Sequence, residues 1–284
     1  MHIYFAGIDI GSTMTKVVIL DSEGYIYSVV KGPTGPEHRR LAYEVLQKGM
    51  RQAELCPDNI VCIVATGYGR MNVPFADFQI TELSCHACGV ARLFPNAQTA
   101  IDIGGQDSKC MKIRQGKLVD FVMNDKCAAG TGRFLEITAA TLGVRLDEIG
   151  PLSLKSAHPR SMSNMCTIFA QQELVAGLSE GAGVEDILAG LHSALSSRIA
   201  AMAKRLRIEP EVVLTGGVAK NAGVVAAMRN ILKTEIHVPE EPLITGALGA
   251  ALFAREQARR ISDGGKSQLS KRHAEGAFTT FFST

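Results

Sequence analysis

The feature that most constrains the fold is a segment that occurs twice in the sequence. GIDIGSTMTKVVILDSEG near the start and AIDIGGQDSKCMKIRQGK later share an apolar strand end with an Asp, a small-residue turn, a Lys and a second strand. Two copies of one supersecondary unit indicate a duplicated α/β architecture with a cleft between its halves. A chain of 284 residues is long enough to give each half a core.

The apolar patterns around these copies predict alternating strands and helices. Three strand-like runs open the chain, and a helix in EHRRLAYEVLQKGMRQAEL and a strand in NIVCIVATG follow. Further helices are expected over residues 77–92, 130–150, 167–180, 184–206 and 219–233, with the strand and turn EVVLTGGVAKN between the last two. The glycine-rich helix TGALGAALFAREQARR ends the folded part.

These patterns predict a division into halves and a tail. We expect residues 1–97 plus 244–260 to form the first half and residues 98–243 to form the second. Residues 261–284 shift to Ser, Gly and charged residues, which is typical of a disordered tail.

Composition excludes several classes of protein. Hydrophobic residues make up 46% and charged residues 20%, as in ordinary globular proteins. The net charge is only +2 and the basic residues are scattered along the chain, so the sequence shows no sign of a basic surface that would bind nucleic acid. The first residues read as a strand and not as a signal peptide, and no apolar run reaches the roughly 18 residues of a membrane span. We therefore expect a cytoplasmic protein without nucleic-acid or membrane partners.

Some of the seven cysteines are expected to be free core thiols, because an odd number in a mid-sized cytosolic chain argues against a disulfide framework. Cys62 and Cys110 lie in apolar strand patterns, which predicts buried core positions. Cys85 and Cys88 form a CxxC motif, but the chain has no second CxxC for a zinc site. Their helical spacing in ELSCHACGVARL predicts a core role.

Cys127 and Cys166 occur in a different context. Cys127 in MNDKCAAGTGRFLE and Cys166 in SMSNMCTIFAQQE each come just ahead of a predicted helix. The positive end of a helix dipole favours thiolate, and hence metal ligation or redox chemistry. Their spacing alone would favour two buried free cysteines.

Three glycine-rich turns each follow an apolar strand, namely DIGST from Asp9, DIGGQD from Asp102 and TGGV from Thr215. Backbone amides in such turns can bind phosphate. Asp9 and Asp102 are suited to hold Mg²⁺, directly or through water, and to orient an attacking water, while Lys16 is suited to neutralise phosphate charge. No Walker motif GxxxxGK[ST] occurs. One such turn would more often be a plain hairpin, but three, two of them with a matched Asp, predict nucleotide binding.

A series of motifs along the chain resembles that of one protein family. In order, GIDIGST, ATGYGR, ELSCHA, IDIGGQDSK, NDKCAAGTGRFLE, CTIFAQQE, LTGGVAKN and GALGAAL resemble the ATP-dependent activators of 2-hydroxyacyl-CoA dehydratases. These activators are related to the ATPase subunits of benzoyl-CoA reductases and belong to the actin, sugar kinase and heat-shock chaperone ATPase superfamily. The resemblance covers about residues 3–256 and implies two ribonuclease-H-like halves that bind ATP and Mg²⁺ in the cleft.

The resemblance also implies roles for single residues. Asp9, Asp102 and Gln106 would be catalytic. The ATP contacts would come from Gly11, Ser12, Thr13, Lys16, Gly104, Gly105, Gly216, Gly217 and Gly246. Lys220 and Asn221 are further candidates near the nucleotide, although helix capping explains them equally well.

A 4Fe-4S cluster is implied at the interface of a homodimer, with Cys127 and Cys166 of each chain as ligands. Such a cluster takes four thiolates, and twofold symmetry doubles the two that one chain offers. The second half would then carry both the cluster ligands and the dimer interface. A reduced ferredoxin or flavodoxin would supply an electron, and ATP hydrolysis would drive its transfer to a 2-hydroxyacyl-CoA dehydratase or a related reductase.

Three alternatives remain at this point. The chain could be the ATPase subunit of a complex similar to benzoyl-CoA reductase. A small-molecule kinase of the same superfamily would use the same phosphate turns without a cluster. A non-enzymatic, ATP-dependent sensor or scaffold would hydrolyse ATP very slowly and give no redox signal.

Overall fold

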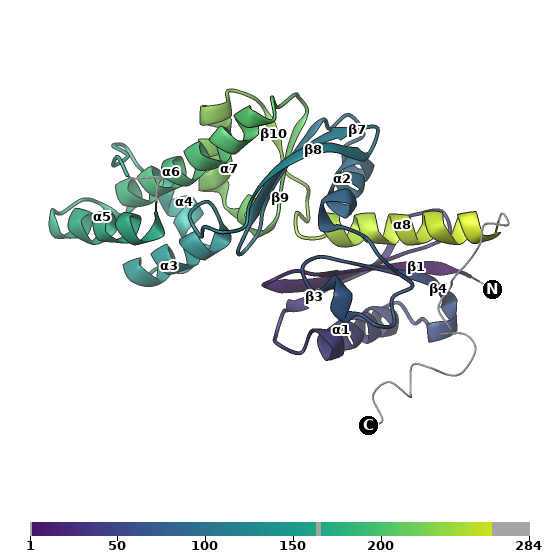
Figure 1. The fold of residues 1–284 in the computed structure, drawn as a ribbon. Coiled ribbons are helices and arrows are strands. Elements are labelled where there is room, and N and C mark those ends of the chain that lie inside the picture. The colour runs from purple at the N-terminus through teal and green to yellow at the C-terminus, as the bar shows by residue number, and fades with distance from the viewer. Residues whose placement is uncertain (1, 163–165, 263–284) are drawn as a thin grey trace. The chain divides into compact units, whose positions relative to one another are not determined.

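The computed structural model describes residues 2–162 and 166–262. The chain divides into two compact units, one formed by Met1–Leu93 with Ile244–Thr284 and the other by Phe94–Leu243. Each unit has its own five-stranded sheet and its own hydrophobic core (Figure 1). From residue 263 onward, the predicted tail lies outside the described residues.

The sheet of the first unit has the strand order β3-β2-β1-β4-β5. β1 (Tyr4–Ile10) pairs antiparallel with β2 (Met14–Leu20), which pairs antiparallel with β3 (Ile26–Pro33). On the other side of β1, β4 (Ile60–Thr66) and β5 (Phe78–Gln79) add in parallel. Every residue of β1 is buried, as expected for a central strand covered on both faces.

Helices cover both faces of this sheet (Figure 1). α1 (His38–Gln52) packs on the face that carries Ile8, while α8 (Thr245–Ser262) lies on the opposite face with α2 (Glu82–Leu93) packed against it. A Cβ atom at Gly7 of β1 would lie 2.0 Å from the Ala247 carbonyl oxygen. The close approach of α8 to the sheet therefore requires glycine at this position.

The sheet of the second unit repeats the topology of the first, with the order β10-β9-β6-β7-β8. β6 (Thr99–Ile103), β7 (Ser108–Arg114) and β8 (Lys117–Asn124) form the antiparallel part. β9 (Val212–Thr215) and β10 (Ile236–His237) add to β6 in parallel. The predicted duplication of an α/β unit is confirmed.

The helices of the second unit follow β8 and β9. They are α3 (Gly132–Leu142), α4 (Ile149–Ser153), α5 (Thr167–Ser179), α6 (Val184–Arg205) and α7 (Ala222–Leu232). α6 and α7 pack against each other, and α4 contacts both. α5 contacts α3 and α6, and its buried residues are Ala170, Leu174 and Gly177.

Three predicted helices begin or end elsewhere than expected. The helix predicted over 77–92 begins at Glu82, because Phe78–Gln79 pairs with β4 as a strand. The helix predicted over 130–150 is two helices, since Gly143 adopts φ 67° and ends α3. The helix predicted over 219–233 begins at Ala222, after a 3-10 turn.

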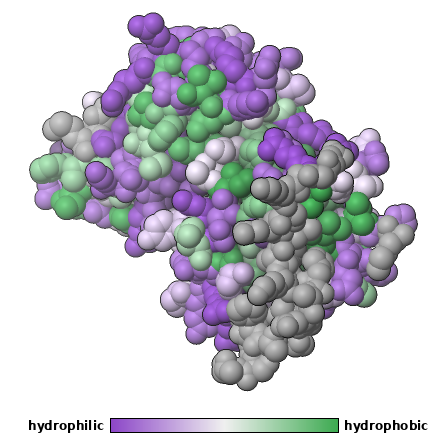
Figure 2. Space-filling model, turned by 45° about the vertical axis from the view of Figure 1, so that its right-hand side comes forward, coloured by the Kyte–Doolittle hydropathy of each residue, from purple (hydrophilic) through white to green (hydrophobic). Residues whose placement is uncertain are grey.

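The surface combines polar and apolar areas. Hydrophilic side chains make up much of the face in Figure 2, and apolar ones gather in smaller groups between them. Three apolar residues of α5 are more than half exposed, namely Ile168, Phe169 and Val175. Among the helices that the structure describes, none is both long and apolar enough to cross a bilayer.

Candidate functional site

Asp9 lies near the end of β1 and is almost completely buried, at 2% exposure. Its Oδ2 accepts a hydrogen bond from Lys16 Nζ at 3.0 Å, because Lys16 stands opposite it on β2. Thr66 stands beside Asp9 on the parallel strand β4. The second carboxylate oxygen, Oδ1, accepts no hydrogen bond from any residue that the structure describes.

Asp102 has the equivalent position in the second unit. Lys109 stands opposite it on β7, and Thr215 stands beside it on β9. Thr215 Oγ1 donates to Asp102 Oδ1 at 2.8 Å. Lys109 is 1% exposed, and its Nζ lies 3.8 Å from Asp102 Oδ2 and 2.8 Å from Asp107 Oδ2. The duplication therefore extends to an Asp, a Lys and a Thr in matching registers.

The parallel strand next to each aspartate ends in a Thr that is followed by a Gly with positive φ. Gly67 follows Thr66 and Gly216 follows Thr215, with φ values of 86° and 84°. A Cβ atom on Gly67 would lie 2.5 Å from the Ile10 carbonyl oxygen, and one on Gly216 would lie 2.3 Å from the Ile103 carbonyl oxygen. Gly216 was predicted from the sequence. Thr66, Gly67 and Lys109 were not, although they lie in the motifs ATGYGR and IDIGGQDSK.

The two phosphate turns have the same backbone hydrogen bond. The Gly11 N–H donates to the Met14 carbonyl at 3.1 Å, and the Gly104 N–H donates to the Asp107 carbonyl at 2.9 Å. These bonds close the turns on which the remaining predicted residues lie. Thr13 and Gln106 are exposed, whereas Ser12 and Gly105 are partly buried. Contact between these residues and phosphate stays a prediction.

The TGG turn begins with the buried Gly216 and the exposed Gly217. Two residues after it have clear structural partners. Asn221 caps α7, since its Oδ1 accepts the Val224 N–H at 3.1 Å. Lys220 forms an ion pair with Glu241 at 3.1 Å. Helix capping therefore accounts for Asn221, as the sequence analysis allowed.

Gly246, in the first turn of α8, lies directly against the Asp9 carboxylate. A Cβ atom there would lie 2.9 Å from Asp9 Oδ2 and 3.1 Å from His86 Nε2. Gly246 is buried, and a side chain at this position would press on the Asp9 carboxylate, which explains the glycine. His86 was not predicted from the sequence as a functional residue.

The surroundings of Asp9 suit a cation or its bound water. A buried carboxylate oxygen without a hydrogen-bond partner is costly unless an ion or water satisfies it. Asp9 Oδ1 is such an oxygen, and carboxylates are the ligands that Mg²⁺ prefers. This residue therefore fits the predicted role in binding Mg²⁺.

Cys127 and Cys166 are both partly exposed, in contrast to the buried Cys62 and Cys110. Cys166 is the N-cap residue of α5, as predicted. Cys127 does not lie at a helix start, because α3 begins only at Gly132. It lies instead in a loop, where Asn124 Nδ2 donates to its carbonyl at 2.8 Å.

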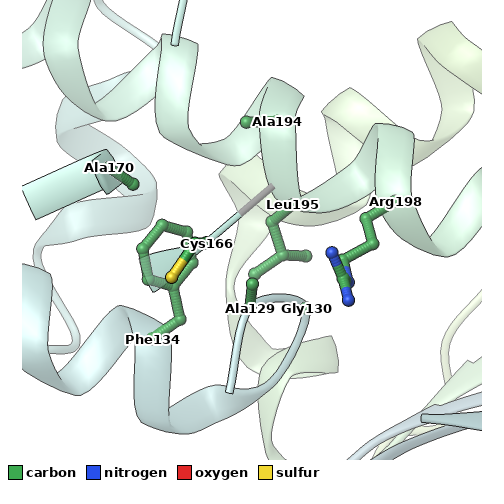
Figure 3. A pocket seen from close by; sticks show the side chains of 8 residues that line it. All are labelled: Ala129, Gly130, Phe134, Cys166, Ala170, Ala194, Leu195 and Arg198. Carbon is green, nitrogen blue, oxygen red and sulfur yellow. The ribbon is translucent and has the colours of Figure 1, made fainter. Parts of the chain in front are cut away.

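A small pocket joins the Cys166 thiol to the loop after Cys127. Figure 3 shows the Cys166 sulfur facing the Phe134 ring, with Ala129 and Gly130 alongside. The remaining lining residues are Ala170, Ala194, Leu195 and Arg198. Cysteine sulfur is a ligand that soft metals and iron–sulfur clusters prefer, and both residues are partly exposed.

The CxxC motif in α2 is different. Burial raises the pKa of the Cys85 thiol to about 12 and that of the Cys88 thiol to about 11. Both therefore stay protonated near neutral pH and are poor ligands. Cys85 is fully buried, which confirms its predicted core role.

Comparison with known proteins gives close relatives. The 2-hydroxyisocaproyl-CoA dehydratase activator of Clostridioides difficile is 47% identical over 262 residues, which cover 90% of this chain and 96% of that protein. The (R)-2-hydroxyglutaryl-CoA dehydratase activating ATPase of Acidaminococcus fermentans is 42% identical over 266 residues, or 92% of this chain and 100% of that protein.

A solved structure has the same fold. The activator of the 2-hydroxyisocaproyl-CoA dehydratase from Clostridium difficile, with bound ADPNP, matches with a TM-score of 0.87 and 44% identity. The match covers 94% of this chain and 100% of that one. The family model for BadF/BadG/BcrA/BcrD ATPases matches residues 6–254. The resemblance drawn from the motifs is thus confirmed, and the chain belongs to the BadF/BadG/BcrA/BcrD ATPase family.

Proposed function

We propose that this chain hydrolyses ATP in order to deliver a low-potential electron to a 2-hydroxyacyl-CoA dehydratase. The ATPase activity is inferred from the two buried aspartates, each of which has a Lys and a Thr at the matching register of the neighbouring strands. The names of the relatives, which activate such dehydratases, support the choice of partner. They favour an activator over a small-molecule kinase or a scaffold.

In the proposed reaction, water attacks the γ-phosphorus of ATP, and the bond between this phosphorus and the oxygen bridging to the β-phosphate breaks. The turns at Gly11 and Gly104 offer backbone amides to phosphate, and Lys16 offers positive charge. Asp9 would hold Mg²⁺ through its free oxygen, directly or through water, where the ion neutralises phosphate charge. Gln106 would orient the attacking water from its exposed position in the second turn.

Backbone hydrogen bonds connect the second turn to the start of α3, which directly follows the loop that carries Cys127. The Gly132 N–H donates to the Gly104 carbonyl, and the Arg133 N–H donates to the Gly105 carbonyl, both at 2.8 Å. A shift of the turn on loss of the γ-phosphate would therefore move the start of α3. A ligand drives such a change only through different affinity for the two states, and the lost phosphate contacts provide that difference.

The thiols of Cys127 and Cys166 would hold a 4Fe-4S cluster together with the same two cysteines of a second copy. Such a cluster supplies one-electron chemistry at low potential. A reduced ferredoxin or flavodoxin would provide the electron, and the dehydratase would receive it. We further propose a cytoplasmic homodimer whose interface lies on the second unit.

Anaerobic purification with iron and sulfide analysis, followed by EPR after dithionite reduction, tests this function. We expect about four iron and four sulfide ions per two chains, since a 4Fe-4S cluster has this composition. Cys127→Ser and Cys166→Ser should each lose the iron and the EPR signal. Cys56→Ser is the matched control, because Cys56 is exposed and lies outside the site.

Two results would contradict the proposal. A protein that binds ATP but takes up no iron after anaerobic reconstitution is not an electron donor of this kind. Iron retained in both Cys127→Ser and Cys166→Ser would assign the ligands to other cysteines.

A further inference from the structure

A partly buried arginine, Arg70, lies in the loop that follows β4, at the start of the short 3-10 turn Arg70–Asn72. Its guanidinium donates a hydrogen bond from Nη1 to the Gly67 carbonyl at 3.1 Å. Among the residues that the structure describes, no carboxylate pairs with this guanidinium. A guanidinium offers five N–H donors, so most of the hydrogen-bonding capacity of Arg70 is available to a ligand or to solvent.

The loop holds Arg70 next to the Asp9 carboxylate and the first phosphate turn. The Gly69 N–H donates to the carbonyl of Ile10, the last residue before that turn, at 2.9 Å. Gly67 packs so closely on Asp9 that a Cβ atom on this glycine would lie 2.4 Å from Asp9 Oδ1. The residue whose carbonyl binds the Arg70 guanidinium therefore also contacts the carboxylate that fits the predicted role in binding Mg²⁺.

The charges at this end of the sheet leave Arg70 as a cation that suits an anionic ligand. Lys16 Nζ and Asp9 Oδ2 form an ion pair at 3.0 Å, so this pair adds no net charge. The transferred phosphoryl group of ATP carries negative charge on three oxygens, and cations stabilise this charge in the transition state. A planar guanidinium matches two such oxygens at once. Tyr68 and Met71, on either side along the chain, are 76% and 71% exposed, so a ligand can reach the loop.

We propose that Arg70 is a catalytic residue that binds the γ-phosphate of ATP and stabilises the charge on it during hydrolysis. The inference rests on the proposed ATPase function and adds a residue to it. Water attacks the γ-phosphorus, and the electron pair of the broken bond stays on the bridging oxygen, which leaves with ADP. Arg70 takes no proton in this step, since its guanidinium remains charged throughout.

Substitution of Arg70 tests this role by comparing nucleotides with and without a γ-phosphate. Arg70→Gln removes the charge, and we expect kcat for ATP hydrolysis to fall at least about a hundredfold. In titration calorimetry with Mg²⁺, the affinity for the ATP analogue ADPNP should fall at least about tenfold, while that for ADP stays within about twofold. Arg70→Lys keeps the charge but not the planar fork, so its kcat should lie between those of Arg70→Gln and the wild type.

The matched control is Arg40→Gln on α1 of the same unit. The Arg40 guanidinium pairs with Glu37 and Glu44, so its loss should leave kcat and both nucleotide affinities unchanged. An unchanged kcat in Arg70→Gln would overturn the proposal. Equal losses of affinity for ADP and ADPNP would also overturn it, because they would assign to Arg70 a structural role in the loop.

Chemical labelling of the wild type keeps the proposal testable even if the Arg70 variants are unstable. Phenylglyoxal modifies accessible guanidinium groups, and mass spectrometry locates the modified residues. We expect ADPNP to protect Arg70 and ADP to leave it reactive, with Arg40 modified equally in both. Equal labelling of Arg70 with the two nucleotides would overturn the inference.

The inference and the proposed function fail in different ways. Failure of the wild-type chain to hydrolyse ATP would overturn the proposed function itself. Hydrolysis that is insensitive to substitution of Arg70 would overturn only the inference.

Discussion

The two buried aspartates are held by different sets of partners. Both oxygens of Asp102 have a neighbour, since Thr215 donates to Oδ1 and Lys109 lies 3.8 Å from Oδ2. Asp9 has Lys16 on one oxygen and no described partner on the other. The two aspartates therefore have equivalent positions, but only Asp9 has a carboxylate oxygen without a described partner. Asp9 is for this reason the better candidate for binding a cation or a water.

Gly246→Ala tests the space beside Asp9. A methyl group 2.9 Å from Asp9 Oδ2 and 3.1 Å from His86 Nε2 would push the carboxylate or the imidazole out of place. We expect kcat for ATP hydrolysis to fall about a hundredfold, since misplacement by about 1 Å has effects of this size. Steady-state kinetics should show no change for Gly35→Ala, where a Cβ atom meets nothing within 4 Å. Full activity of Gly246→Ala would show that the exact position of the Asp9 carboxylate does not matter for hydrolysis.

His192 links stability to pH. It is 1% exposed, and burial lowers its pKa from 6.5 to about 4. The unfolded chain therefore binds a proton below pH 6.5 that the folded chain binds only near pH 4, so stability falls as pH falls through this window. Between pH 7.5 and pH 5 we expect a loss of about 2 kcal/mol from this group.

Urea denaturation of the wild type and of His192→Gln at pH 7.5 and pH 5 measures this pH-dependent loss of stability. The variant should be less stable at pH 7.5, because His192 bonds Ser153 and Asn221 at 2.9 and 3.2 Å. Its further loss on acidification should be smaller by about 2 kcal/mol. An identical loss in both proteins would mean that His192 does not titrate in this window.

At the level of elements, the close packing of α8 against α2 depends on glycine residues. A Cβ atom on Gly249 would lie 1.8 Å from the Cys85 carbonyl oxygen of α2, and one on Gly89 of α2 would lie 2.0 Å from the Thr245 carbonyl oxygen. The two helices therefore contact each other through their backbones. The glycine-rich start that marked this helix in the sequence is explained by packing.

Gly249→Ala should therefore be strongly destabilising. The added methyl group overlaps backbone atoms that cannot rotate away, so the cost exceeds the usual 1–3 kcal/mol of overpacking and is expected to reach at least about 3 kcal/mol. Thermal or urea unfolding measures it. Gly32→Ala is the control, since its Cβ atom would lie at an ordinary 3.6 Å from Val45. A variant as stable as the wild type would mean that α2 and α8 can separate without cost.

Sequence patterns predicted these elements to different degrees. The antiparallel strands of both sheets were predictable, because short turn signals divide their apolar runs. The start of α2 was predicted wrongly, since Phe78–Gln79 is a strand only through its pairing with β4. The loop position of Cys127 was also missed, because the backbone of Gly132 and Arg133 bonds to the Gly104 turn and fixes where α3 begins.

At the level of the whole molecule, a shared cluster predicts that iron and association are coupled. If Cys127 and Cys166 of two copies bind one cluster, its removal takes away the bonds that join them. We expect exposure to air with a chelator to shift the protein from the mass of two chains to that of one in light scattering. Anaerobic reconstitution with iron and sulfide should restore the dimer in the wild type and in Cys56→Ser, but not in Cys166→Ser. A dimer that persists without iron would assign the association to protein contacts alone.

The duplication, the two Asp-containing turns, the family and the pair of distinctive cysteines could all be predicted from the amino-acid sequence. These features are local, since each depends on residues within one strand, turn or motif. Only the tertiary structure placed Thr66 and Lys16 on either side of Asp9, buried Lys109 between two carboxylates and turned His86 toward Gly246. These arrangements join residues that are distant along the chain, and strand register and helix packing, which no local pattern specifies, bring them together.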